Sequence, residues 1–252
     1  MRFALVAFLF ATTVMPADDL PDWVIALSRI KHHTRDDLQR IPNYVCLETV
    51  DRYEAHPGKG FQKRDTLHLQ VAEVDGKELT APAEADRLDV GDLRSFAPTG
   101  TIGTGAFSST AFNLFVSDNG RTTGWEREEA AGSSTWRFDF EISERESGFR
   151  VTSSNETAVV GERGSFRADA KTFDLLRLET EAVDIPLRLG LLEVSTRIEY
   201  HRVRIGKVDV LMPKSAEHVL ISANGARNRN EITFSGCREY RTDSVIKFDS
   251  GK

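Results

Sequence analysis

The feature that most constrains the fold is a two-residue alternation of apolar and charged side chains in the C-terminal half of the chain. In "TWRFDFEI", Trp136, Phe138, Phe140 and Ile142 alternate with charged residues. This pattern predicts a β-strand, because successive side chains of a strand point to opposite faces. Similar segments follow one another, separated by turn signals such as "GERG", "DAKT" and "NGARN". Such short connections indicate antiparallel hairpins, since parallel strands need long crossovers.

Some ten strands of this kind would not remain one flat sheet, because large twisted sheets curl or split. Alternation on most strands also predicts one buried face and one wetter face. We therefore expect a mainly β, α+β fold: a curved antiparallel sheet or incomplete β-barrel, covered by an N-terminal amphipathic helix and short helices. A flat two-sheet sandwich is the alternative.

The covering helix is predicted over residues 20–41, where the period changes to that of a helix and Pro42 follows. Its apolar stripe consists of Leu20, Trp23, Val24, Leu27, Ile30, Leu38 and Ile41. Adjacent histidines cannot point to one side of a helix. We therefore interpret "KHHTR", which contains His32 and His33, as a solvated helix side and not as a metal site.

A long stretch at about residues 82–131 is rich in Gly, Ser and Thr and is interpreted as an insertion. A short helix is predicted around Ser109 to Phe115, with clustered aromatic residues that include Phe107, Phe112 and Phe115. Two interpretations stay open: a functional loop or lid, and a connector whose phenylalanines fill the open side of the barrel.

The first 17 residues are typical of a secretory signal peptide: Arg2, a short apolar run, and Ala17 before two aspartates. A short anchor or a buried strand is the alternative interpretation. The expected mature chain is residues 18–252, a single β-rich half-barrel domain that is periplasmic or secreted. It contains no further segment that is predicted to span a membrane.

An exported chain with one pair of cysteines favours a disulfide between Cys46 and Cys237. Two free, buried cysteines are the alternative. The chain lacks a CxxC motif and clustered sulfur ligands, which argues against thiol-redox chemistry and a cysteine zinc site.

Charge and motifs exclude several classes of function. The formal net charge of -6 argues against nucleic acid as a partner, because phosphate binding needs a basic surface. The glycines of "GTIGTG" do not fit the dinucleotide fingerprint, and the GxSxG, HExxH, P-loop and EF-hand patterns do not occur. We predict no cofactor, no metal and no catalytic residue, and therefore no enzyme.

Several segments in order resemble a group of uncharacterised bacterial secreted proteins, among them "RIPNYVCLETVDRY", "GTGAFSSTAFNLF" and "FSGCREYRTDSVIKF". The unit "SFRADAKTFDLLRLE" followed by "YHRVRIGKVDVLMP" is also similar to the repeating hairpins of periplasmic lipoprotein carriers of the LolA type. That resemblance implies an incomplete antiparallel barrel closed by helices, with an apolar cavity for acyl chains.

The function predicted from these observations is a non-enzymatic binding protein that holds a lipid or acyl chain between the sheet and its helices. The expected ligand-binding residues are the large apolar ones of the helix, the insertion and the clearest strand: Trp23, Leu27, Phe107, Phe112, Phe115, Trp136, Phe138 and Phe140. The alternatives are a module that docks another envelope protein through a sheet edge or the insertion, and a hydrolase without a recognisable motif.

Overall fold

The computed structural model describes residues 20–74, 77–85, 97, 99–103, 109–130, 132–153 and 156–240. The predicted signal peptide and Phe107 lie outside these residues. Among the described residues, no helix is long and apolar enough to cross a membrane.

An open antiparallel sheet dominates the structure, as predicted. Its eleven strands are β1 (Tyr44–Ala55), β2 (Gln62–Val74), β3 (Lys77–Pro82), β4 (Arg121–Ala130), β5 (Ser133–Ile142), β6 (Phe149–Ser153), β7 (Glu156–Asp169), β8 (Leu175–Val183), β9 (Leu191–Ile205), β10 (Val208–Ser222) and β11 (Arg227–Glu239). Ten of them follow the order β3-β2-β1-β11-β10-β9-β8-β7-β5-β4, and β6 pairs with β7. The first long strand therefore lies beside the last.

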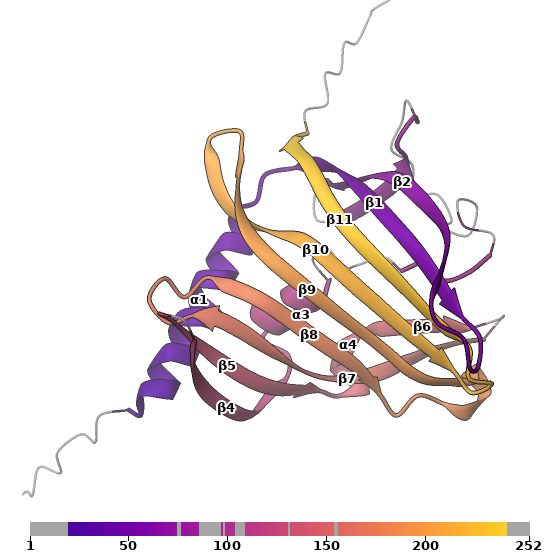
Figure 1. Cartoon of the computed structure of the whole chain (residues 1–252). Coiled ribbons are helices and arrows are strands. Elements are labelled where there is room, and N and C mark those ends of the chain that lie inside the picture. Colours follow the sequence, from indigo (N-terminus) through magenta and orange to yellow (C-terminus); the bar gives the residue numbers. More distant parts are fainter. Residues whose placement is uncertain are drawn as a thin grey trace, which may run out of the picture.

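Helices cover one side of this sheet (Figure 1). They are α1 (Asp22–Arg40), α3 (Ser109–Phe115), the short α4 (Glu144–Ser147) and the 3-10 turn η1 (Leu187–Leu189). We call the covered side the concave face. The bounds of α1 and α3 confirm the two helices predicted from the sequence.

The predicted stripe is confirmed in part, since Ile30 is buried and Trp23, Leu27, Leu38 and Ile41 pack against the core. Leu20 is exposed, and the buried residues of α1 also include Ala26, Thr34 and Asp37. The interpretation of "KHHTR" as a solvated side holds only in part: His32 is exposed, Thr34 is buried, and the other three residues are half-buried. Two polar contacts turn this side of the helix toward the protein, because Lys31 pairs with Asp118 and Arg35 donates to the carbonyl of Phe115.

The predicted insertion at 82–131 is shorter than expected, since residues 121–130 form the edge strand β4. Its sequence "RTTGWEREEA" carries one large apolar residue, Trp125, and charged residues on both faces. An edge strand with little buried area does not need the alternation that identifies interior strands, which explains why the sequence pattern missed β4.

Cys46 on β1 and Cys237 on β11 form the predicted disulfide, with their Cα atoms 4.1 Å apart. A bulge lies at this point, because the register shifts between Val45 and Leu47 on β1. Gly236 adopts a left-handed φ of 60° there. A glycine in this conformation allows two residues of one strand to face one residue of its partner. The bulge thus brings Cys237 opposite Cys46.

The other face of the sheet, which we call the convex face, carries cross-strand ion pairs. Arg167 of β7 donates to Glu128 of β4 and to Glu179 of β8, each at 3.0 Å. Arg197 of β9 donates to the same Glu179 at 2.8 Å. These charges alternate with the inward apolar residues, so the period-two pattern of the sequence separates a wet face from a core.

Candidate functional site: the concave face

An apolar row crosses the centre of the concave face from β2 to β4. Its members are neighbours in register on successive strands: Leu67, Val50, Ile232, Ala216, Ile198, Leu178, Phe166, Phe138 and Trp125. Directly opposite side chains on one face are close enough to pack. The row therefore forms the floor of the core.

Aromatic rings continue this floor from the surface into the interior. Trp125 stacks on Trp23 of α1 with ring centroids 5.8 Å apart, and lies 6.0 Å from Trp136. Trp136 and Phe138 follow at 6.1 Å, and Phe138 and Phe166 at 5.4 Å. We call these five residues the aromatic path.

Exposure falls steeply along the aromatic path. Trp125 at the sheet edge is 50% exposed, Trp136 is 6% exposed, and Phe138 is fully buried. The exposed end lies between α1 and β4. It is the one point on this path where an apolar molecule could touch an aromatic ring without first displacing the core.

Six of the eight predicted ligand-binding residues belong to this core or pack against it: Trp23, Leu27, Phe115, Trp136, Phe138 and Phe140. Phe112 does not, as it is 45% exposed. The reason is helical spacing, because α3 turns Ala111, Leu114 and Phe115 inward and leaves Phe112 on its other side. Whether the six bind a ligand stays a prediction.

Sequence reasoning missed two members of the aromatic path, Trp125 and Phe166. Phe166 is fully buried and contacts Phe115 edge-on at 5.1 Å. Its signal was present in the alternating strand "SFRADA". Trp125 had no comparable signal, since its strand lacks alternation.

A polar row lies next to the apolar one on the same face. In register across the strands it contains Asp65, Arg52, Asn230, His218, Thr196 and Thr180. Arg52 is 3% exposed and binds both carboxylate oxygens of Asp65, at 2.7 and 2.5 Å. This pair is balanced in charge, and its hydrogen bonds hold the pKa of the half-exposed Asp65 below its usual value.

Residues 99–103, which we call the strap, lie over the polar row. Arg52 Nη1 donates to the carbonyl of Thr99 at 2.7 Å, and Arg64 Nη2 donates to its hydroxyl at 2.8 Å. Asn230 Nδ2 donates to the carbonyl of Thr101 at 3.0 Å. Side chains of three strands thus hold the backbone of the predicted loop against the sheet.

His218 lies under the far end of the strap. Its Nδ1 is 2.8 Å from the hydroxyl of Thr196, and a Cβ at Gly103 would lie 3.5 Å from its Nε2. Within the described part of the chain Nε2 has no hydrogen-bond partner. Burial lowers the pKa of His218 to about 4, so the ring is neutral at pH 7.

A second buried ionisable group, Glu48, lies on β1 between Leu69 and Phe234. Burial, assisted by the nearby charge of Glu78, raises the pKa of Glu48 to about 8. This carboxyl is therefore protonated at neutral pH. With His218 also neutral, both groups add polarity without charge to the concave face.

The described residues contain one group of possible metal ligands, His33, Asp37 and Asp174, whose ligand atoms lie within 4.8 Å of one another. The guanidinium of Arg202 lies among them: it is 2.9 Å from Asp37, 2.5 Å from Asp174 and 2.9 Å from the His33 ring. Arg40 also binds Asp37, at 2.6 Å, so two guanidinium groups already balance the two carboxylates. The cluster ties α1 to β9 and to the turn before β8.

Comparison with known proteins gives matches in structure alone, since no family model and no curated protein matches the sequence. A LolA superfamily protein from Nitrosomonas europaea is 12% identical, with a TM-score of 0.40, over 85% of this chain and 93% of its own. A domain from Vibrio parahaemolyticus, described as that of an outer membrane lipoprotein-sorting protein, is 11% identical, with a TM-score of 0.45, over 84% and 92%. These are proteins of the type that the hairpin motifs resemble.

Proposed function

We propose that this protein is a non-enzymatic binding protein that holds an apolar ligand, such as an acyl chain, on the concave face between the sheet and α1. The observation that carries the proposal is the aromatic path. It offers apolar surface at an exposed edge and continues it to a fully buried centre. Each methylene group removed from water there would contribute about 0.8 kcal/mol.

Ligand entry to this face requires a movement of the helices that cover it. The rings of Phe115, Phe138 and Phe166 touch one another, so an acyl chain needs α1 or α3 to shift away from the sheet. Buried Ala26 and Ile30 anchor α1 in the core, and the helix is also held by polar contacts with Arg202 and by the stack of Trp23 on Trp125.

We place this function outside the cytoplasm. The support is the disulfide between Cys46 and Cys237, a bond that persists in oxidising compartments. The signal-peptide pattern of residues 1–17 supports the same location.

The test uses the three tryptophans of the chain, Trp23, Trp125 and Trp136, all of which lie on the aromatic path. Titration with 9,10-dibromostearate should quench their fluorescence in a saturable way, because bromine quenches tryptophan on contact. Unbrominated stearate should reverse the quenching by competition. An absence of quenching at tens of micromolar dibromostearate would overturn the proposal.

A matched pair of variants locates the site. Leu27→Asp places a charge on α1 one turn from Trp23 and should weaken quenching at least tenfold. Leu187→Asp makes the same change in η1, at a residue that is 96% exposed, and should leave quenching unchanged. Equal behaviour of the two variants would place the bound chain elsewhere.

A second candidate is a module that docks another protein. Its specific support is the exposure of two leucines after β8: Leu187 in η1 is 96% exposed, and Leu192 at the start of β9 is 67% exposed. Large apolar side chains this exposed are typical of interaction surfaces when they cluster. Chemical cross-linking in an envelope extract, with Leu187→Asp as the comparison, separates this function from ligand binding.

A further inference from the structure

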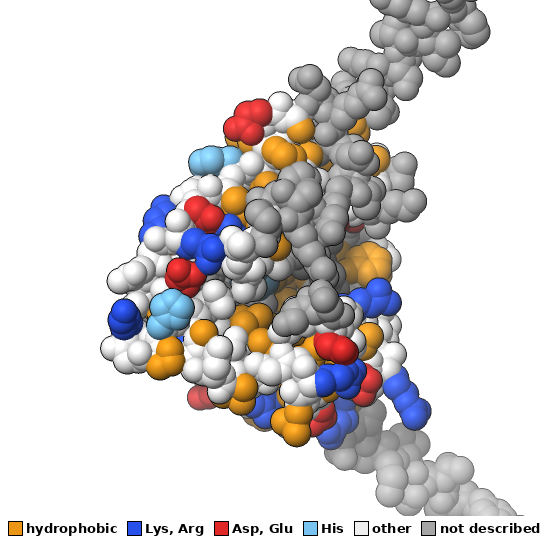
Figure 2. Space-filling view, turned by 90° about the vertical axis from the view of Figure 1, so that its right-hand side faces the viewer, with side chains coloured by type: hydrophobic (Ala, Val, Ile, Leu, Met, Phe, Trp, Pro, Cys, Tyr) orange, Lys and Arg blue, Asp and Glu red, His pale blue; other side chains and the backbone are white. Residues whose placement is uncertain are grey.

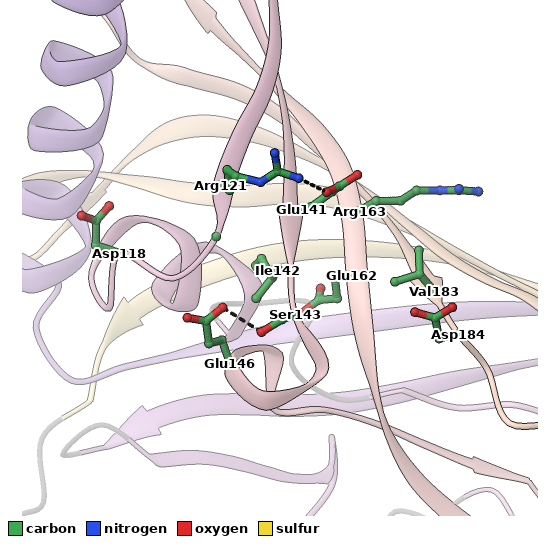
Figure 3. Close-up of a pocket in the computed structure, with 11 residues that line it drawn as sticks. Asp118, Arg121, Glu141, Ile142, Ser143, Glu146, Glu162, Arg163, Val183 and Asp184 are labelled. Atoms are coloured by element: carbon green, nitrogen blue, oxygen red, sulfur yellow. Dashed lines mark hydrogen bonds and ion pairs between the residues drawn. The ribbon is translucent and has the colours of Figure 1, made fainter.

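A cavity of about 700 Å³ lies outside the proposed acyl site, where β5 ends and α4 begins (Figure 3). Its walls come from β5, β7, the end of β8 and the turn before β4. This volume suits a small organic molecule. The residues of the aromatic path do not line it.

Two glycines leave room for side chains that line this cavity. A Cβ at Gly120, whose φ is 101°, would lie 2.9 Å from Cγ1 of Ile142. A Cβ at Gly161 would lie 2.9 Å from Cγ2 of Val183. Ile142 and Val183 both line the cavity, so larger residues at the two glycines would push its walls inward.

The lining is acidic, and its two arginines are already paired. Arg121 binds Glu141 at 2.8 Å, as Figure 3 shows, and Arg163 binds Glu181 at 2.9 Å. The remaining lining carboxylates include Glu146, Glu162 and Asp184, and none of these three forms a salt bridge with a described residue. The cavity therefore has an excess of negative charge.

Glu162 differs from the other lining carboxylates because it is only 2% exposed. Its one side-chain hydrogen bond within the described chain, 3.3 Å long, comes from the hydroxyl of Thr110 on α3. Burial raises the pKa of Glu162 to about 7. A buried carboxyl that lines a cavity and lacks a cationic partner is typical of a binding site, since a bound cation would replace the missing partner.

We propose that this cavity binds a small organic cation, such as a primary amine or a diamine, whose ammonium group pairs with Glu162. A bare metal ion fits less well, because the lining carboxylates do not form a group with ligand atoms within 4.8 Å of one another. Carboxylates that are spread over a large cavity match an extended molecule with separated ammonium groups.

The proposal does not depend on the acyl site, and calorimetry with 1,4-diaminobutane at pH 8 tests it. The wild-type protein should bind the diamine, and Glu162→Gln should weaken binding at least tenfold because it removes the charge at constant shape. Glu144→Gln is the matched control: Glu144 lies on α4, is exposed and does not line the cavity. This control should bind like the wild type.

Three results would overturn the proposal: no heat of binding in the wild type at millimolar diamine, unchanged binding by Glu162→Gln, or equal losses in both variants. Tighter binding of calcium chloride than of the diamine would also overturn it. Glu146→Gln, at the exposed rim, provides a second variant that removes one lining charge without touching the buried carboxyl. Quenching by dibromostearate in Glu162→Gln shows separately whether the acyl site is intact.

Discussion

The two ends of the concave face are covered in different ways. Toward β4, β5 and β7 the face is filled by its own aromatic rings, and α1 and α3 pack on them. Toward β1, β2 and β11 polar side chains hold the strap by hydrogen bonds to its backbone. We call these the aromatic end and the polar end.

The difference shows what each end can do. Packing at the aromatic end is non-directional, so an acyl chain could replace one apolar contact with another. Hydrogen bonds at the polar end are directional, and a buried donor left without an acceptor costs about 1–3 kcal/mol. The polar end therefore fixes the position of the strap, whereas the aromatic end supplies apolar surface. Scattered charges of both signs surround hydrophobic side chains on the side seen in Figure 2.

The largest expected effect concerns the disulfide at the polar end. Cys46→Ser opens a covalent loop of 191 residues and should lower the free energy of unfolding by as much as about 5 kcal/mol. Quenching by dibromostearate should be unchanged below the new melting temperature. Thermal melts with and without reductant measure the effect, and a wild-type melting temperature that reductant does not change would contradict it.

Phe138→Ala should have the next largest effect, at the aromatic end. Phe138 is fully buried between Trp136 and Phe166, so its loss leaves a cavity and should cost about 3–5 kcal/mol. Urea unfolding measures this cost. If stearate binds in the new cavity, it should recover part of the stability, which would distinguish the aromatic end from the polar end.

Glu48→Gln tests the buried carboxyl through pH. The folded pKa of about 8 lies above the unfolded value near 4.5, so the wild type loses stability as pH rises between these values. At pH 8 the variant should be more stable than the wild type by about 2–4 kcal/mol, and at pH 4 the two should be equal. A stability difference that does not change with pH would be inconsistent with a protonated Glu48.

Asn230→Ala should have the smallest effect on stability, about 1–2 kcal/mol, because it removes one hydrogen bond to the strap. Its more specific result is faster amide hydrogen exchange in residues 99–103. Asn228→Ala is the matched control, two residues away on the same strand. Equal exchange in the two variants would show that Asn230 does not hold the strap.

Much of the fold could be predicted because alternation is a local property. The alternation within one strand predicted that Trp136, Phe138 and Phe140 share a face, and the bounds of α3 could be predicted from neighbouring residues. The disulfide was also predictable, because the chain has only two cysteines. The position of Phe112 was not, since clustering of aromatic residues in sequence does not say which of them a helix turns inward.

The sequence alone determined the strand pattern, the covering helices, the wet face and the pairing of the cysteines, because each depends on periodicity or counting. Tertiary structure alone decided which strands became neighbours, and so created the polar row, the strap contacts and the setting of Glu162. Asp65, Arg52, Asn230 and His218 come from four strands, and Arg52 and Asn230 are 178 positions apart in the sequence. No local pattern links such residues, because the sheet register that aligns them is set by contacts distant in sequence.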